Sequence, residues 1–261
     1  MEMEMPKTLR WAQNELLVSG RDRPGMAGEQ FRRMRIRLEG LRETVGEAIR
    51  VILVTSPMMN EGKTSTAANL ALSLAHEEGR RVVLVDCDIR KAKLQSYFVR
   101  PPTAGLEDVV GDGVPLERAI SLVEGSSLHV IGLLKGSDRR IDPLPVERIK
   151  AVLKVLRSRY DFIVCDGPPI LPLADTAALA RLVDGIVMVV RSGFTPRDAV
   201  TRSLGVLDKT KMIGFVLNAV SERSIGRYYY GYHPDEAGGK GSQNGNRKQS
   251  GRGGVVSKKE E

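Results

Sequence analysis

The chain has 261 residues, of which 41% are hydrophobic, and it carries a formal net charge of +8. This length and composition predict one domain with a good core and terminal tails, while the charge suits phosphates, anionic membrane surfaces or acidic partners without selecting among them. Cys87 and Cys165 follow no metal-ligand spacing, so we expect reduced, packed thiols. Apolar runs are shorter than the ~20 residues of a membrane helix and the N-terminus lacks a signal-peptide core, which predicts a cytoplasmic protein.

The first part of the chain is predicted to be an arm followed by a helix. Residues 1–27 combine charges, prolines and weak periodicity, so we expect a flexible arm that either docks through Trp11 or stays loose. A helix is predicted from Glu29, and its apolar side consists of Phe31, Met34, Leu38 and Leu41. Glu29, Arg32 and Arg35 follow the opposite side, so the helix has one face for a core and one charged face.

The next two hundred residues, roughly, alternate β-rich runs with helical patterns. Predicted strands lie within residues 50–56, 80–88, 128–134, 161–167, 185–192 and 213–220. Their successive apolar residues are typical of strands that a parallel sheet buries on both faces. Helical patterns cover residues 67–75, 146–158, 175–183 and 197–209. The order predicts an α/β domain over residues 28–226, with a doubly wound, mostly parallel sheet and helices on both faces.

The C-terminal part begins with a cluster of tyrosines in residues 227–233. The cluster consists of Tyr228, Tyr229, Tyr230 and Tyr232. It is either a small aromatic patch packed on a neighbour or a set of phosphate acceptors. Residues 234–261 are rich in glycine and charge and poor in apolar residues, which predicts a disordered tail.

The segment from residue 51 to residue 75 has the pattern of a strand, a loop and a helix, as in P-loop NTPases. Its loop reads SPMMNEGKTS, and the residues expected to surround phosphates are Asn60, Glu61, Gly62, Lys63, Thr64 and Ser65. Backbone N–H groups, the Lys63 ammonium and the helix N-terminus offset phosphate charge, and the Thr64 hydroxyl suits Mg²⁺. The match to the strict spacing is incomplete, because Pro57 replaces the first glycine.

Two further strands are predicted to end in aspartates. Asp86 and Asp88 follow one strand and Asp166 follows another. Ligands of open α/β sheets bind beyond the carboxyl ends of the strands, so the three carboxylates are expected to converge on the phosphates and Mg²⁺. Since Mg²⁺ takes few carboxylates, one of them is free to act as a base. The plainer interpretation is that these aspartates cap helices or turns.

In combination these motifs resemble the bacterial tyrosine kinases, in particular the cytoplasmic kinase chains of capsule and exopolysaccharide export. The resemblance runs from about Glu29 to Tyr232. The family's Walker A, A′ and B motifs are matched by SPMMNEGKTS, VVLVDCDIRK and FIVCDGPP, and its C-terminal tyrosine cluster by YYYGY. Its EX2RX2R motif, implicated in subunit packing, is matched by Glu29, Arg32 and Arg35.

The resemblance implies an ATP-dependent protein-tyrosine autokinase. It implies that Lys63 binds the β- and γ-phosphates, that Thr64, Asp88 and Asp166 hold Mg²⁺, and that Asp86 orients or deprotonates the tyrosine hydroxyl. The roles of Asp86 and Asp88 are exchangeable at this stage, and Asn218 is a candidate neighbour of the adenine. The four clustered tyrosines are the implied acceptors.

The resemblance also implies partners: other copies of the chain in a ring, and a separate transmembrane activator that recruits the kinase to the inner face of the membrane. No nucleic acid is expected. Two rival interpretations remain open. One is a dimerising P-loop ATPase of the partition or septum-positioning type, although Met58 stands where those ATPases have an additional lysine. The other is an ATP-binding scaffold of an export complex with little kinase activity.

Overall fold

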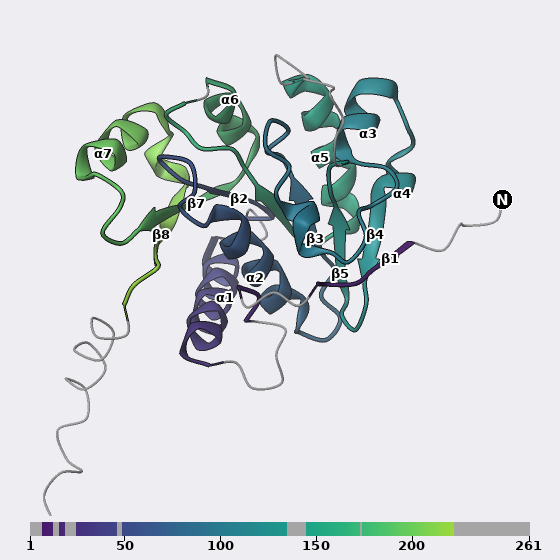
Figure 1. Cartoon of the computed structure of the whole chain (residues 1–261), viewed down its shortest axis with the longest axis horizontal. Coiled ribbons are helices and arrows are strands. Elements are labelled where there is room, and N and C mark those ends of the chain that lie inside the picture. The colour runs from purple at the N-terminus through teal and green to yellow at the C-terminus, as the bar shows by residue number, and fades with distance from the viewer. Residues whose placement is uncertain are drawn as a thin grey trace, which may run out of the picture. The chain divides into compact units, whose positions relative to one another are not determined.

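The fold is described from a computed structural model that covers residues 7–12, 16–18, 25–45, 49–134, 145–172 and 174–221 (Figure 1). The predicted tyrosine cluster at 227–233 and the predicted tail at 234–261 lie outside these residues. Within them, the two cysteines are free and buried, as the sequence predicts.

The centre of the structure is an eight-stranded sheet with the strand order β1-β4-β5-β3-β6-β2-β7-β8. The strands are β1 (Lys7–Leu9), β2 (Val51–Thr55), β3 (Val82–Asp86), β4 (Ile120–Val123), β5 (Leu128–Ile131), β6 (Phe162–Asp166), β7 (Gly185–Arg191) and β8 (Met212–Asn218). All neighbours are parallel except β4 and β5. The predicted α/β fold with a mostly parallel sheet is therefore confirmed.

Helices cover both faces of this sheet (Figure 1). One face carries α1 (Met26–Val45) and α2 (Lys63–Ala75). The other carries α3 (Leu106–Asp112), α5 (Val146–Arg159), α6 (Ala174–Leu182) and α7 (Arg197–Val206), with the short α4 (Leu116–Ala119) at the edge beside β4. Two 3₁₀ turns, Leu94–Tyr97 and Lys209–Lys211, complete the described elements.

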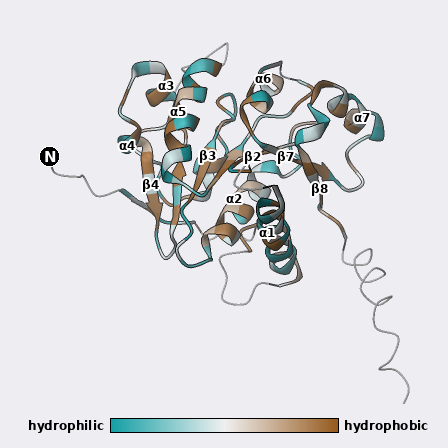
Figure 2. Ribbon diagram, turned by 180° about the vertical axis from the view of Figure 1, so that it is seen from behind, coloured by the Kyte–Doolittle hydropathy of each residue, from teal (hydrophilic) through white to brown (hydrophobic). Residues whose placement is uncertain are grey.

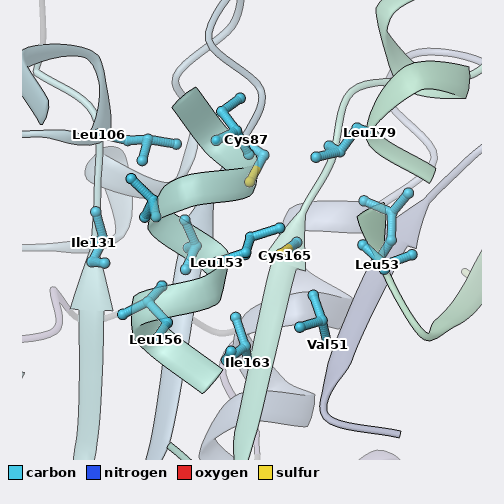
Figure 3. Packing of buried hydrophobic residues seen from close by; sticks show 14 of the residues in the cluster. Val51, Leu53, Cys87, Leu106, Ile131, Leu153, Leu156, Ile163, Cys165 and Leu179 are labelled. Carbon is cyan, nitrogen blue, oxygen red and sulfur yellow. The ribbon is translucent and has the colours of Figure 1, made fainter. Parts of the chain in front are cut away.

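Each central strand contributes to two separate cores because successive side chains point to opposite faces. In β2, Val51 and Leu53 pack with α3, α5 and α6 (Figure 3), whereas Ile52 and Val54 pack against α1 and α2. Figure 2 shows the resulting apolar strands between the two helix layers. This double burial explains why the strands have continuous apolar sequences rather than alternating ones.

The N-terminal arm corrects one expectation, since its described residues are not loose. Residues Lys7–Leu9 add a strand beside β4, and the Trp11 ring stacks on Phe98 with 4.3 Å between ring centroids. The flexible-arm prediction is thus wrong for residues 7–12, and docking through Trp11 is the alternative that holds. Backbone pairing with the edge strand and burial of aromatic surface stabilise this arrangement.

Candidate active site

The phosphate-binding loop predicted from the sequence lies between the carboxyl end of β2 and the first turn of α2 (Figure 1). Two residues of the loop have left-handed backbone conformations, Asn60 with φ 63° and Gly62 with φ 93°. A Cβ atom on Gly62 would lie 1.9 Å from the Asn218 side-chain nitrogen. Glycine is therefore required at this position both by the backbone and by the close approach of β8.

The loop begins without the first glycine of the strict motif, and other contacts fix its start. The Thr55 hydroxyl donates to the Pro168 carbonyl at 2.7 Å. The backbone N–H groups of Ile170 and Leu171 donate to the carbonyls of Ser56 and Pro57 at 2.9 and 3.2 Å. The segment after β6 thus holds the strand-to-loop junction, and Pro57 needs no N–H donor there.

Glu61 and Asn218, which the sequence assigns to nucleotide binding, contact the loop itself in this structure. The Glu61 side chain is fully buried and accepts hydrogen bonds from the Met58 N–H, at 2.8 Å, and from the Thr195 hydroxyl. The Asn218 amide nitrogen donates to the Glu61 carbonyl at 2.9 Å. Asn60, Lys63, Thr64, Ser65 and Asn218 also line the cavity described below, so their contact with a nucleotide stays a prediction.

The predicted catalytic residues converge at the carboxyl ends of β3 and β6. Asp86 and Asp166 are register partners on these neighbouring strands. The Lys63 ammonium lies 2.8 Å from an Asp88 carboxylate oxygen, and both side chains are nearly buried. One Asp86 oxygen accepts from the Asp88 N–H at 3.1 Å. Among the described residues, the other Asp86 oxygen and both Asp166 oxygens are buried without a hydrogen-bond partner.

The buried carboxyl groups have perturbed acidities. Burial raises the pKa of Asp166 to about 7, although the Lys63 ammonium opposes the shift. Burial, followed by the charges of Asp166 and Asp88, raises the pKa of Asp86 well above its usual value. Three carboxyl groups therefore lie close to the Lys63 ammonium, and additional positive charge would favour their ionised forms.

The carboxylates of this site suit a metal ion whose remaining ligands come from phosphates and water. Within the described part of the chain, no group of three or more His, Cys, Asp or Glu side chains is arranged as a metal site of its own. Mg²⁺ commonly takes only one or two carboxylates and completes its shell with phosphates and water. The unpartnered Asp166 oxygens beside Thr64 therefore fit such an ion, whereas Asp88 is engaged by Lys63 here.

A cavity of about 850 Å³ opens in front of the loop. Its lining includes five cationic side chains, those of Lys63, Arg90, Lys91, Lys93 and Arg191. A volume of this size accommodates a nucleotide, and the cations suit its phosphates. Sequence reasoning missed Arg191, although its position at the carboxyl end of a predicted strand was a usable signal.

Apolar residues also line the cavity, which no sequence pattern indicated. They include Phe31 of α1, Val18 of the N-terminal segment and Tyr97. The Asn69 side chain, on α2, accepts from the Val18 N–H at 2.7 Å and donates to the Leu16 carbonyl at 2.6 Å. The N-terminal segment therefore forms part of the cavity wall.

The three residues predicted to mediate oligomerisation do not share one exposed face, which corrects the helix prediction. Glu29 and Arg32 form a surface ion pair with atoms 2.7 Å apart. Arg35 is 8% exposed and pairs with Glu77, just beyond α2. Steps of three residues drift by about 60° around a helix, so Arg35 turns toward the side that buries Leu38.

The tyrosine cluster stays a prediction, and a membrane-spanning helix is absent from the described residues. The predicted acceptors Tyr228, Tyr229, Tyr230 and Tyr232 lie outside the described residues. Among the helices of the described part, none is long and apolar enough to span a bilayer.

Comparison with known proteins identifies one matching family model and several similar proteins. A model of the AAA domain family matches residues 50–201. The tyrosine-protein kinase YwqD of Bacillus subtilis (strain 168) is 31% identical over 211 residues, which cover 78% of this chain and 86% of that protein. The succinoglycan biosynthesis transport protein ExoP of Rhizobium meliloti (strain 1021) is 29% identical over 77% of this chain, which spans only 26% of that longer protein.

Several solved structures have a fold similar to that of this chain. The crystal structure of the chimerical protein CapA2B2 matches with a TM-score of 0.69 at 24% identity, covering 84% of this chain and 96% of that one. The cell division ATPase MinD of Pyrococcus furiosus matches with a TM-score of 0.52 at 25% identity, covering 67% of this chain and 74% of that one. These likenesses support the P-loop NTPase type of α/β fold and the use of a nucleotide.

Proposed function

The chain belongs to the AAA domain family and to the tyrosine-protein kinases, and from this premise we propose that it transfers the γ-phosphoryl group of ATP to tyrosine hydroxyls in capsule or exopolysaccharide synthesis. The observation that carries the proposal is the buried Lys63–Asp88 pair beside Asp86, since both residues of the pair line a cavity rich in cationic side chains. A lysine held in this way is available to exchange its carboxylate partner for a phosphate.

Lys63 and Asp86 have separate tasks in the proposed reaction. The Lys63 ammonium moves from Asp88 to the β- and γ-phosphate oxygens and offsets their charge. Asp86 accepts a hydrogen bond from the incoming tyrosine hydroxyl and takes its proton. A bond forms between the tyrosine oxygen and the γ-phosphorus while the bond to the β-phosphate oxygen breaks, releasing ADP. The raised pKa of Asp86 suits this task, because it makes the ionised carboxylate a stronger base than an ordinary aspartate.

Thr64, Asp166 and Asp88 would hold Mg²⁺ in the loaded site, and the ion would supply charge neutralisation at the phosphate oxygens. The unpartnered Asp166 oxygens support this assignment. Release of Asp88 from Lys63 on nucleotide binding would free it as the second carboxylate. Asn218 is proposed to approach the adenine, since it lines the cavity.

The acceptors are proposed to be Tyr228, Tyr229, Tyr230 and Tyr232 of a neighbouring copy in a ring. Each added phosphate carries about −1.5 to −2 charges at neutral pH, so modification beside the acidic site would expel the product and open the ring. Glu29 and Arg32 lie on the surface of α1, where they can contact another subunit. Arg35 is buried and pairs with Glu77 of the same chain. A separate transmembrane activator would recruit the kinase to the membrane.

The likeness to MinD makes a dimerising ATPase the second candidate. The loop argues against it, because Met58 occupies the position of the additional lysine and its N–H is held by Glu61 within the same chain. An ATP-binding scaffold with little kinase activity is the other alternative.

Incubation of the purified protein with Mg²⁺ and ATP, followed by detection of phosphotyrosine, tests the proposal. We expect phosphotyrosine in the wild type, with the cytoplasmic part of an activator added if required, and none in Lys63→Met. That variant keeps the aliphatic stem and removes the charge. ATP turnover without phosphotyrosine in the presence of activator would favour the ATPase, and ATP binding without either reaction would favour the scaffold.

A further inference from the structure

Glu61 is a buried acidic residue in the phosphate-binding loop for which the proposed reaction has no use. Its side chain is 0% exposed. One carboxylate oxygen accepts from the Met58 N–H at 2.8 Å, and the other accepts from the Thr195 hydroxyl. A buried carboxylate is costly unless its oxygens are hydrogen-bonded, so this geometry must be maintained for the loop to keep its shape. We name these three groups the Glu61 brace.

The brace acts on the part of the loop that lacks the usual glycine. Pro57 stands at that position, and Met58 follows it directly. The Glu61 carboxylate binds the N–H of Met58, three residues earlier in the chain. Asn60 lies between these two residues and has a left-handed conformation, with φ 63°. Such conformations persist only where surrounding contacts determine them. The brace is one of those contacts.

Thr195 extends the brace to the turn between β7 and α7. Its hydroxyl oxygen accepts from the Arg191 N–H at 2.9 Å while it donates to Glu61. The Arg191 guanidinium in turn donates to the Asn60 carbonyl at 3.2 Å, and Arg191 lines the cavity. One threonine therefore connects the shape of the loop with the position of a cavity cation.

We propose that Glu61 and Thr195 are positioning residues for nucleotide binding, which hold the backbone N–H groups of the loop and the Arg191 guanidinium where the phosphates of the nucleotide dock. The inference rests on the proposed function in that it takes this cavity to be the nucleotide site. It goes beyond that function because it assigns part of the affinity to a hydroxyl that touches neither phosphate nor metal ion. A purely structural role for the same contacts would affect folding but leave the affinity of the folded protein unchanged.

Thr195→Val and Thr195→Ser form the central comparison. Valine keeps the shape and removes the hydroxyl, whereas serine keeps the hydroxyl. We expect Thr195→Val to weaken binding of ATP and ADP with Mg²⁺ about tenfold, because without this hydrogen bond to a charged group the free loop adopts other conformations, and the apparent affinity falls with the fraction of loop that is competent to bind. Thr195→Ser should bind within about twofold of wild type. The KM for ATP should rise more than kcat falls, because the loop binds ground state and transition state alike.

Thr201→Val is the matched control. Thr201 lies on α7, and its exposed hydroxyl donates only along the helix, to the Arg197 carbonyl at 3.2 Å. Its substitution should leave both dissociation constants unchanged. Melting temperatures without nucleotide, measured for every variant, ensure that affinities are compared among folded proteins.

A double-mutant cycle with Glu61→Gln tests whether the two residues act through one contact. Glutamine keeps the shape but presents an NH₂ donor in place of one acceptor oxygen. If the brace is one unit, Thr195→Val should cost little further affinity in the Glu61→Gln background. Additive losses, or wild-type affinity in Thr195→Val, would overturn the inference while leaving the kinase assignment intact. Failure of the wild type to bind Mg²⁺–ATP would overturn both.

Discussion

Substitution of Gly62 by alanine provides a quantitative test of the loop geometry. The substitution forces an L-residue to adopt φ 93°, which costs about 1–2 kcal/mol. The new Cβ would also lie 1.9 Å from the Asn218 side-chain nitrogen, so that side chain must move. The movement breaks the 2.9 Å hydrogen bond to the Glu61 carbonyl, which is worth about 1 kcal/mol. We therefore expect Gly62→Ala to destabilise the protein by about 2–3 kcal/mol.

Gly79→Ala separates the two contributions. Gly79 has a similar left-handed conformation, with φ 75°, but nothing lies within 4 Å of an added Cβ. Both substitutions lower the entropy of the unfolded chain equally, so this gain cancels in the comparison. Urea unfolding should then give a cost about 1 kcal/mol larger for Gly62→Ala.

The collision with Asn218 predicts a rescue. In an Asn218→Ala background the space beside Gly62 is free, so Gly62→Ala should cost no more than Gly79→Ala does. Equal costs for the two glycines in the wild-type background would refute the reasoning. An undiminished cost of Gly62→Ala in the Asn218→Ala background would refute it as well, because the strain would then have another source.

Three further outcomes follow from the contacts around the site and the fold. Asp86→Asn should abolish phosphotyrosine formation yet retain most Mg²⁺–ATP affinity, whereas Asp88→Asn should lose affinity; the reverse result in a binding titration would exchange their roles. Arg35→Ala should destabilise the protein by about 1 kcal/mol in urea, since it removes the packed stem of a buried side chain, whereas the Glu77 carboxylate that it leaves is half exposed and is solvated by water; a change near zero would return Arg35 to the surface motif. Asp184→Asn should cost about 2 kcal/mol at pH 7, and the difference from wild type should shrink as the pH falls below the ordinary aspartate pKa of about 4. Burial raises the pKa of Asp184, but hydrogen bonds from Arg157 and backbone N–H groups outweigh burial and hold this pKa below its usual value. The contribution of Asp184 to stability is therefore present above the pKa of the unfolded state and is lost as the pH falls through the pKa of the folded state. A pH-independent difference would contradict this.

The sequence by itself determined the fold class and the position of the phosphate-binding loop, because both depend on local patterns. Strands buried on both faces must be apolar at successive positions, and a loop that surrounds phosphates needs Gly62 and Lys63 beside a helix start. Asp86 and Asp166 could be expected to meet because parallel strands present their carboxyl ends at one edge of the sheet. The structure places them in register on β3 and β6.

Other features depend on pairings between distant parts of the chain, to which a linear pattern gives no access. The strand Lys7–Leu9 is too short to carry a periodic signal, and it forms because β4 offers an edge. The ion pair of Arg35 with Glu77 was decided by the packing of α1 against α2. Thr195 meets Glu61 across 134 positions of sequence. Hydrophobic periodicity reports which side of an element is buried, but only the packing of the elements decides which polar side chains become partners.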